Sequence, residues 1–241
     1  MDYNSSSSAA PHRTRRIVLV SLVIIGLASV LFTVRRPLLM SAPACMAGRW
    51  HGCYDTENGV LLMMLVGLPL AALTACALTH FRRAAATPAR YQPASSAWRM
   101  SLAEVGMVYG TVPMVWLTLM PGPGAGFVRG RLSLIPLQDL VTMGPIGIGG
   151  NLLIFAALGF FAPMRFAVLA SVPRILALGA ACSLLVEIAQ YVFQLDRVSS
   201  VDDILINAIG AALAALASRR WWRTPAEAPS PQPHPATASA S

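Results

Sequence analysis

Lysine is absent from this sequence of 241 residues, and charged residues of all kinds make up only 12% of it. A soluble domain has roughly 25% charged residues, so their scarcity argues against a soluble protein. All 18 basic residues are arginines, and with 10 acidic residues they give a formal net charge of +8. No block of arginines is interleaved with aromatic residues as on a nucleic-acid recognition helix, so we expect no nucleic-acid partner.

Apolar residues make up 56% of the chain, and the mean hydropathy is +0.61. They gather in six long runs, at residues 17–34, 60–79, 100–120, 146–163, 175–193 and 201–217. The first run has no charge in 18 residues, enough for about 27 Å of helix at ~1.5 Å per residue. We therefore predict an all-α fold, a polytopic integral membrane helical bundle with six transmembrane helices in a lipid bilayer.

The runs divide the chain into regions. Residues 1–16 begin with a serine run and residues 223–241 are rich in proline, alanine and serine, so we expect both to be disordered tails. Residues 17–120 hold three transmembrane helices with an outer loop at 35–59, and residues 131–217 hold the other three. Small residues four apart, as at Gly106 and Gly110 or at Gly210 and Ala214, let helices approach closely. They say nothing of the oligomeric state.

Arginine placement predicts the orientation. With the N-terminus inside, twelve arginines lie on the inner side and six on the outer side, as the positive-inside rule favours. We therefore expect a multi-pass protein of the bacterial cell membrane with both termini in the cytoplasm. A signal peptide cleaved near "SAPAC" is the disfavoured alternative, because Arg35 and Arg36 separate the apolar run from that site.

The outer loop between the first two runs contains Cys45 and Cys53, eight positions apart. A disulfide between them and two free thiols are both open on the oxidising side of the membrane. His51, Asp55 and Glu57 in the same loop lack a recognised metal-ligand spacing, so we expect no metal site. The glycine-rich segments at 120–127 and 143–151 match no complete nucleotide fingerprint, which predicts outer turns and no cofactor.

Polar residues lie in and beside the last two runs, in "SLLVEIAQYVFQLDRVSSVDDILINAIG" (residues 183–210). A charged group at membrane depth costs on the order of 2–3 kcal/mol even on the lenient insertion scale, so Glu187 should face protein or water. The polar residues within each run share one helix face, and the others lie near the outer ends of the runs, so we expect all of them to face one outward-opening region. The candidate pocket residues are Asn151, Glu187, Gln190, Arg197, Asp202, Asp203 and Asn207.

A purely structural role is the competing interpretation for most of them. Asp202 and Asp203 lie at a helix N-terminus, where acids suit the helix dipole and Ser199 or Ser200 can cap. Gln190 and Asn207 can bond between helices, and Arg197 can be a solvated loop charge. Glu187 differs, because burying it requires a partner.

Three segments resemble the VanZ-like family of bacterial membrane proteins, over roughly residues 131–217. "RLSLIPLQDL" resembles the family's Asn-Leu-Ile-Pro-Phe segment, with Ser133 at the Asn position and Leu137 at the Phe position. "GNLLIFAALGFFAPM" resembles its Asn-Leu-Leu-x-Phe-x-Pro-x-Gly-Phe segment, with Ala157 at the Pro position. The third, "LLVEIAQYVFQLDRVSSVDDILINAIGAALA", resembles its run of Ile-Glu-x-x-Gln, Arg, Asp-Asp, Asn and Gly.

The family's namesake is associated with reduced susceptibility to the glycopeptide teicoplanin, which the resemblance makes an expectation here. The leading hypothesis is a membrane protein whose polar pocket binds an envelope lipid-linked molecule or a glycopeptide. Arg197 would hold an anionic group and Glu187 would accept a proton. The alternatives are a membrane enzyme acting on a lipid-linked substrate, with Glu187 and Asp203 as acid and base, and a small proton-coupled transporter using Glu187 and Glu104.

Overall fold

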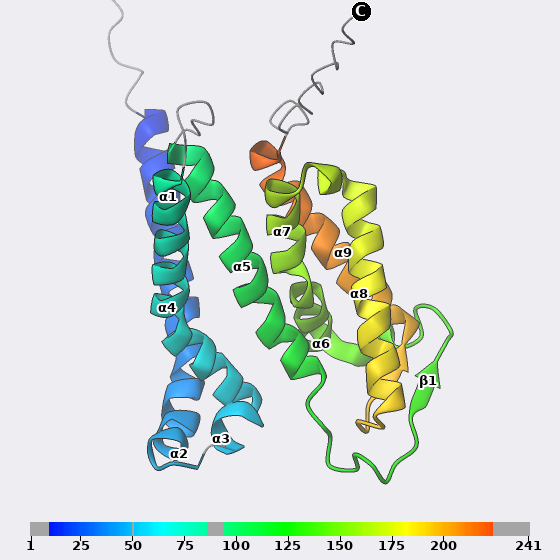
Figure 1. The fold of residues 1–241 in the computed structure, drawn as a ribbon. Coiled ribbons are helices and arrows are strands. Elements are labelled where there is room, and N and C mark those ends of the chain that lie inside the picture. Colours follow the sequence, from blue (N-terminus) through cyan, green and yellow to red (C-terminus); the bar gives the residue numbers. More distant parts are fainter. Residues whose placement is uncertain (1–9, 50, 86–93, 224–241) are drawn as a thin grey trace, which may run out of the picture. The chain divides into compact units, whose positions relative to one another are not determined.

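The computed structural model describes residues 10–49, 51–85 and 94–223 of a helical protein (Figure 1). The chain divides into two compact units, residues 1–67 and 68–241. The predicted tail at 223–241 lies outside the described residues except for Arg223. Of the predicted tail at 1–16, residues 10–16 are helical, because helix α1 begins at Ala10. Pro11 is compatible with this start, since a first-turn residue needs no backbone N–H.

The first unit contains α1 (Ala10–Arg36), a π-helical turn η1 (Pro37–Ser41), α2 (Ala42–Met46) and α3 (His51–Tyr54). Helix α4 (Glu57–Ala84) begins in this unit and ends in the second. The predicted outer loop at 35–59 therefore consists largely of short helices. Cys45 and Cys53 form a disulfide between α2 and α3, with their Cα atoms 5.6 Å apart.

Five helices in the described part of the chain are long and apolar enough to cross a membrane, one fewer than predicted. They span Glu57–Ala84, Ser95–Thr118, Leu140–Arg165, Val172–Val192 and Val201–Trp221. Each encloses one of the last five predicted runs or coincides with it to within two residues at the C-terminal end, so the all-α membrane fold is confirmed. The first run, residues 17–34, lies in α1, which is helical throughout but is not among the five.

Helix α9 (Val201–Ser218) is the centre of the second unit. It packs against α6 (Leu140–Ile154), α7 (Ala156–Arg165) and α8 (Val172–Val192). Half of its membrane window is buried, compared with 11–33% in the other four spans. Helix α5 (Ala94–Thr118) packs on α7 from the other side. The C-terminal region of the chain is thus surrounded by helices that precede it.

Glycines allow these helices to approach closely. A Cβ on Gly210 of α9 would collide with the backbone carbonyl of Leu152, and one on Gly159 of α7 would collide with that of Ala211. On α8, a Cβ at Gly179 would lie 3.2 Å from the Cα of Ala208. The prediction of close packing at Gly210 is confirmed. Gly106 and Gly110 of α5 also face α7, because a Cβ on Gly106 would collide with the Phe161 side chain and one on Gly110 with that of Ala157.

Two short strands that the sequence did not predict join distant parts of the second unit. β1 (Arg131–Ser133) and β2 (Val198–Ser200) pair in parallel, with Leu132 opposite Ser199. The segment at 143–151, predicted as a turn, is helical within α6, which is a correction. Only Gly144 departs from helical geometry, with φ 68° and ψ 166°. Pro145 after it restarts a helix readily, because its fixed φ suits the first helical turn.

A charge cluster joins three helices at the end of the unit that carries the C-terminus of α9. Glu104 of α5 forms ion pairs with Arg82 of α4 and Arg165 of α7, one through each carboxylate oxygen. The Arg82 guanidinium also donates to Ser101, at 2.5 Å. Glu104 is therefore compensated on both sides, which suits a structural role for this acid within a membrane helix.

We expect Gly210→Ala to destabilise the protein by about 1–3 kcal/mol, because the added methyl group meets backbone that cannot rotate away. Gly149→Ala is the matched control. Gly149 lies on α6, the helix that Gly210 packs against, and a Cβ there would meet no atom within 4 Å. Thermal unfolding of the purified protein in detergent measures both. Equal midpoints for the two variants would contradict the close packing of α9.

Candidate functional site

A pocket of about 150 Å³ opens between α8, α9 and the two strands. Apolar side chains form most of its wall, and Glu187 is its only acidic residue. The lining residues are Leu132, Leu134, Leu184, Glu187, Ile188, Tyr191, Ser199, Ser200, Val201 and Ile204. The pocket is therefore an apolar cavity with one carboxyl group, rather than the polar pocket that the sequence suggested.

Glu187 is 6% exposed and is held by β2. Its side chain accepts a hydrogen bond from the backbone N–H of Ser200, at 3.0 Å. The Ser199 hydroxyl donates to the backbone carbonyl of Glu187, also at 3.0 Å. These bonds fix the start of α9 against α8, and they supply the partner that burial of an acid requires. The backbone N–H of Ser200 is a partner that sequence spacing does not reveal.

Asp202 is fully buried and caps a different helix from its own. Its carboxylate accepts the backbone N–H groups of Leu137 at 2.5 Å, Asp139 at 2.9 Å and Leu140 at 3.2 Å. Leu137 and Asp139 precede α6 and Leu140 begins it, and backbone donors at the start of a helix have no partner within that helix. Asp202 itself is capped by Ser200, whose hydroxyl accepts its N–H at 3.1 Å. The predicted serine cap of this helix is therefore present.

Asp203 and Asn151 form a pair between α9 and α6. The Asn151 amide donates to the Asp203 carboxylate at 2.6 Å, and both residues are half-buried. Asp203 follows by three residues Ser200, whose backbone N–H donates to Glu187. Asn151 and Glu187 therefore both contact the beginning of α9 or the residue before it, although Asn151 and Asp203 do not line the pocket.

Gln190 and Asn207 hold neighbouring segments together. The Gln190 amide donates to the backbone carbonyl of Thr118 at 2.8 Å, which ties α8 to the end of α5. The Asn207 amide donates to the Ser183 hydroxyl at 2.8 Å, inside the contact between α9 and α8. The Asn207 Oδ1 atom is buried and has no hydrogen-bond partner among the described residues. Both side chains face protein and lie outside the pocket wall.

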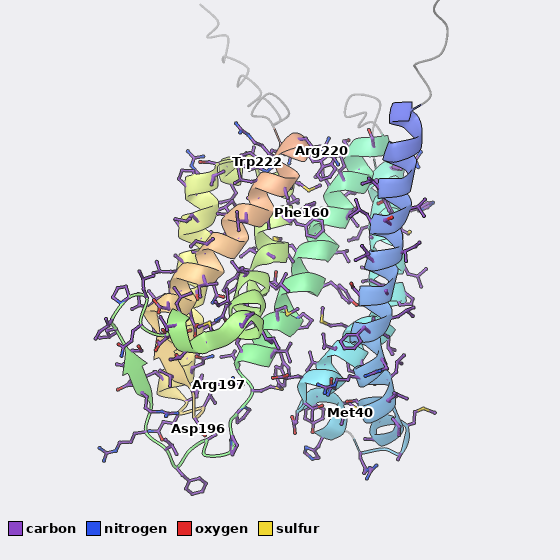
Figure 2. The ribbon with its side chains drawn as sticks, turned by 180° about the vertical axis from the view of Figure 1, so that it is seen from behind. Met40, Phe160, Asp196, Arg197, Arg220 and Trp222 are labelled. Atoms are coloured by element: carbon purple, nitrogen blue, oxygen red, sulfur yellow. A yellow bond between two sulfur atoms is a disulfide. The ribbon has the colours of Figure 1, made fainter. Side chains whose placement is uncertain are left out.

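Arg197 lies in the connection between α8 and β2. It is exposed, and its guanidinium makes a long contact of 3.5 Å with the backbone carbonyl of Met120. Its neighbour Asp196 accepts the backbone N–H of Gly124 at 3.0 Å and approaches Arg131 at 3.7 Å. Figure 2 shows Asp196 and Arg197 at one end of this unit, opposite Arg220 and Trp222.

Sequence reasoning missed Asp196 and the apolar pocket wall. Leu184, Glu187, Ile188 and Tyr191 lie on one face of α8, at the three- and four-residue spacing of a helical stripe. That spacing was available from the sequence, but in a helix that is apolar all round it does not distinguish a pocket from a lipid-facing surface. Asp196 carried no signal, because its role depends on the left-handed backbone at that position (φ 55°) and on a distant loop.

The first unit presents no metal centre in its described residues. His51 contacts the Asp55 carboxylate at 2.8 Å, and Cys53 is in the disulfide. Across the parts of the chain that the structure describes, no three His, Cys, Asp or Glu residues are grouped to hold a metal ion.

Comparison with known families assigns the second unit. Residues 93–222, more than half of the chain, match the family model described as VanZ/LLP1. The chain belongs to the VanZ/LLP1 family. This match includes α5, so it extends further toward the N-terminus than the resemblance seen in the sequence motifs. With its five apolar helices, the chain is a multi-pass VanZ/LLP1 membrane protein. No curated protein and no solved structure matches it.

We expect Asp202→Ala to cost about 3 kcal/mol or more of stability, because it leaves buried N–H groups at the start of α6 without an acceptor. Asp202→Asn keeps one acceptor oxygen and should lie between Asp202→Ala and the unchanged protein. Asp55→Ala is the control, an exposed acid whose loss should cost less than about 1 kcal/mol. Thermal unfolding in detergent gives the comparison, and equal effects at Asp202 and Asp55 would refute the capping role.

Proposed function

We propose that this VanZ/LLP1 protein binds the apolar chain of an envelope molecule, either a lipid-linked cell-envelope intermediate or the lipid-like tail of a glycopeptide. The observation that carries the proposal is the pocket itself, an apolar cavity with one buried carboxyl group, Glu187. Ligand sites are typically apolar cavities with a few placed polar groups, and this pocket has that character.

The size of the pocket limits what enters it. An apolar cavity of about 150 Å³ can hold a benzene-sized group. The pocket therefore takes one segment of a hydrocarbon chain, and the rest of the ligand lies outside it. Leu184, Ile188 and Tyr191 are each partly exposed at the wall, so a chain can continue from the pocket along α8.

A polar headgroup would lie near Arg197. This residue precedes the pocket residue Ser199 by two positions, and its guanidinium makes only one long contact in the described structure. A guanidinium binds phosphate or carboxylate in a bidentate manner, so Arg197 suits an anionic headgroup. Arginine counts favour placing this end of the protein outside the cytoplasm, where envelope intermediates and glycopeptides are met.

Filling the pocket should block binding. We expect Ile204→Trp to reduce crosslinking of a photoreactive polyprenyl phosphate by about tenfold or more, equivalent to ~1.4 kcal/mol of affinity. Leu205→Trp is the matched control, because Leu205 is the next residue of α9 and does not line the pocket. The measurement is crosslinked protein against probe concentration in lipid nanodiscs.

Arg197→Ala belongs in the same assay and should weaken capture of the phosphate probe without affecting a photoreactive alcohol of equal chain length. If Ile204→Trp and Leu205→Trp bind equally and Arg197→Ala changes nothing at normal protein levels, the proposed site is wrong.

The teicoplanin connection can be tested in cells. We expect expression of the unchanged protein in a lipoglycopeptide-susceptible bacterium to reduce susceptibility to teicoplanin and not to vancomycin. Glu187→Gln and Asp203→Asn should remove the effect at equal membrane levels, because they change the charge at the pocket and beside it. The measurement is the susceptibility of cells with and without the protein to both antibiotics. If expression of the wild-type protein leaves teicoplanin susceptibility unchanged, this protein differs in activity from the family's namesake.

A membrane enzyme is the second candidate, favoured by two acids near the beginning of α9: Glu187 in the pocket wall, bonded to the backbone of Ser200, and Asp203 three residues after that serine. One acid would then donate a proton to a lipid-linked substrate while the other accepts one. In that case Glu187→Gln would retain capture of the probe and lose turnover, whereas a binding protein has no turnover to lose.

A further inference from the structure

The segment at residues 132–146 exposes an unusual number of large apolar side chains. It comprises β1 from Leu132, the connection to α6 and the first half of that helix. Ile146 is 92% exposed and Val141 is 86% exposed. The exposed apolar residues of the segment are Leu132, Leu134, Ile135, Leu137, Val141 and Ile146. In water, a connected surface of this kind would be unfavourable for a monomeric protein.

The sequence around the segment has the charge pattern of a membrane boundary. Arg129 and Arg131 immediately precede it, and both are exposed. From Leu132 to Met164 the only charged residue is Asp139. Asp139 is half-buried, and its carboxylate accepts a hydrogen bond from the Ser200 hydroxyl at 2.5 Å, so it faces protein. Basic residues followed by a long stretch without exposed charge are typical of the transition from headgroups to hydrocarbon.

Several backbone groups of the segment have partners within the protein, although much of the segment is not helical. β1 pairs with β2, and the N–H groups of Leu137, Asp139 and Leu140 all bind the buried carboxylate of Asp202. Irregular backbone is tolerated at membrane depth only where protein satisfies it, because hydrocarbon offers no hydrogen bonds. The carboxylates of half-buried Asp139 and fully buried Asp202 face the protein interior, and the large apolar side chains of the segment face outward, with Gln138 and Thr142 as exposed polar residues among them.

Its position along α8 gives the depth. Leu132 and Leu134 share the pocket with Glu187 and Leu184, and Figure 1 shows β1 alongside the same half of α8. Helix α8 is a membrane span that ends at Val192. Glu187 lies five residues and Leu184 eight residues before that end, which is about 7–12 Å along the helix at ~1.5 Å per residue. The segment therefore lies below the end of the span, at the boundary of headgroups and acyl chains.

We propose that the connection before α6, together with the start of that membrane span, forms a membrane-inserted loop at residues 132–146 whose apolar side chains contact the acyl chains of one leaflet. The partner is the lipid bilayer, because the exposed surface of the segment continues into that of α8, where Leu184, Leu185 and Ile188 are also exposed on a membrane span. The pocket between the segment and α8 then opens within the leaflet, and an apolar chain reaches it sideways from the membrane. The insertion rests on the loop's geometry and holds whether or not the pocket binds a ligand.

Nitroxide spin labels in the full-length protein test the insertion. The background is Cys76→Ala with Cys182→Ala, which removes the two free thiols and leaves the disulfide intact. Single labels are attached at Ile135→Cys and Val141→Cys in the loop, at Leu185→Cys as the lipid-exposed control, and at Arg129→Cys as the aqueous control. The protein is reconstituted into phosphatidylethanolamine–phosphatidylglycerol vesicles, and collision rates with oxygen and with a water-soluble nickel chelate are measured.

We expect oxygen to collide with the labels at 135 and 141 more often than the nickel chelate does, as at 185, with the reverse at 129. A nickel preference at 135 and 141 would place the loop in water and overturn the proposal. Low collision rates with both reagents would mean that protein covers the loop, such as a second copy of the chain, and would overturn it as well. Only labelled variants that retain the thermal unfolding midpoint of the background are compared, so misfolding does not imitate either result.

Discussion

The second unit depends on one buried carboxylate that satisfies backbone donors from another part of the chain. Asp202 begins α9 and accepts three N–H groups from residues that precede and begin α6. In a membrane, water cannot replace such bonds, and each unsatisfied group costs several kcal/mol. The start of α6, the path of the connection from β1 and the wall of the pocket therefore depend on this contact. It explains an aspartate at zero exposure in a chain with few charges.

Helix α9 combines two kinds of contact that a membrane bundle needs. Along one part its side chains are small, and glycines on both sides of the contacts let the neighbouring helices approach its backbone: Gly210 of α9, Gly159 of α7 and Gly179 of α8. At its beginning it is polar, and its side chains bind neighbouring elements through Asp202, Asp203 and Asn207. Close packing and interhelical hydrogen bonds drive association where lipid removes the hydrophobic difference. The polar residues of this apolar helix are largely accounted for by this role.

The sequence predicts most of the helices and little of what joins them. Apolar runs locate five spans, and the cost of a charge at membrane depth predicts that Glu187 faces protein or water; in the structure it is buried. The pairing of β1 with β2 could not be predicted, because each strand has three residues and their partners lie more than 60 positions apart. The capping by Asp202 was hidden for the same reason. Gly144 suggested a turn, but a single residue with positive φ only kinks α6, since Pro145 restarts it.

The same contacts decide which polar residues remain free to act on a ligand. Asp202 and Asn207 are enclosed by the groups that they bind, so replacing those partners with a ligand would unfold the start of α6 or separate α8 from α9. Glu187 is different, because it is buried and yet borders the cavity. A carboxyl group in that position is costly to maintain for structure alone, since an apolar residue of similar size would pack there with less desolvation. Its place in an otherwise apolar wall therefore favours a role toward whatever enters the pocket.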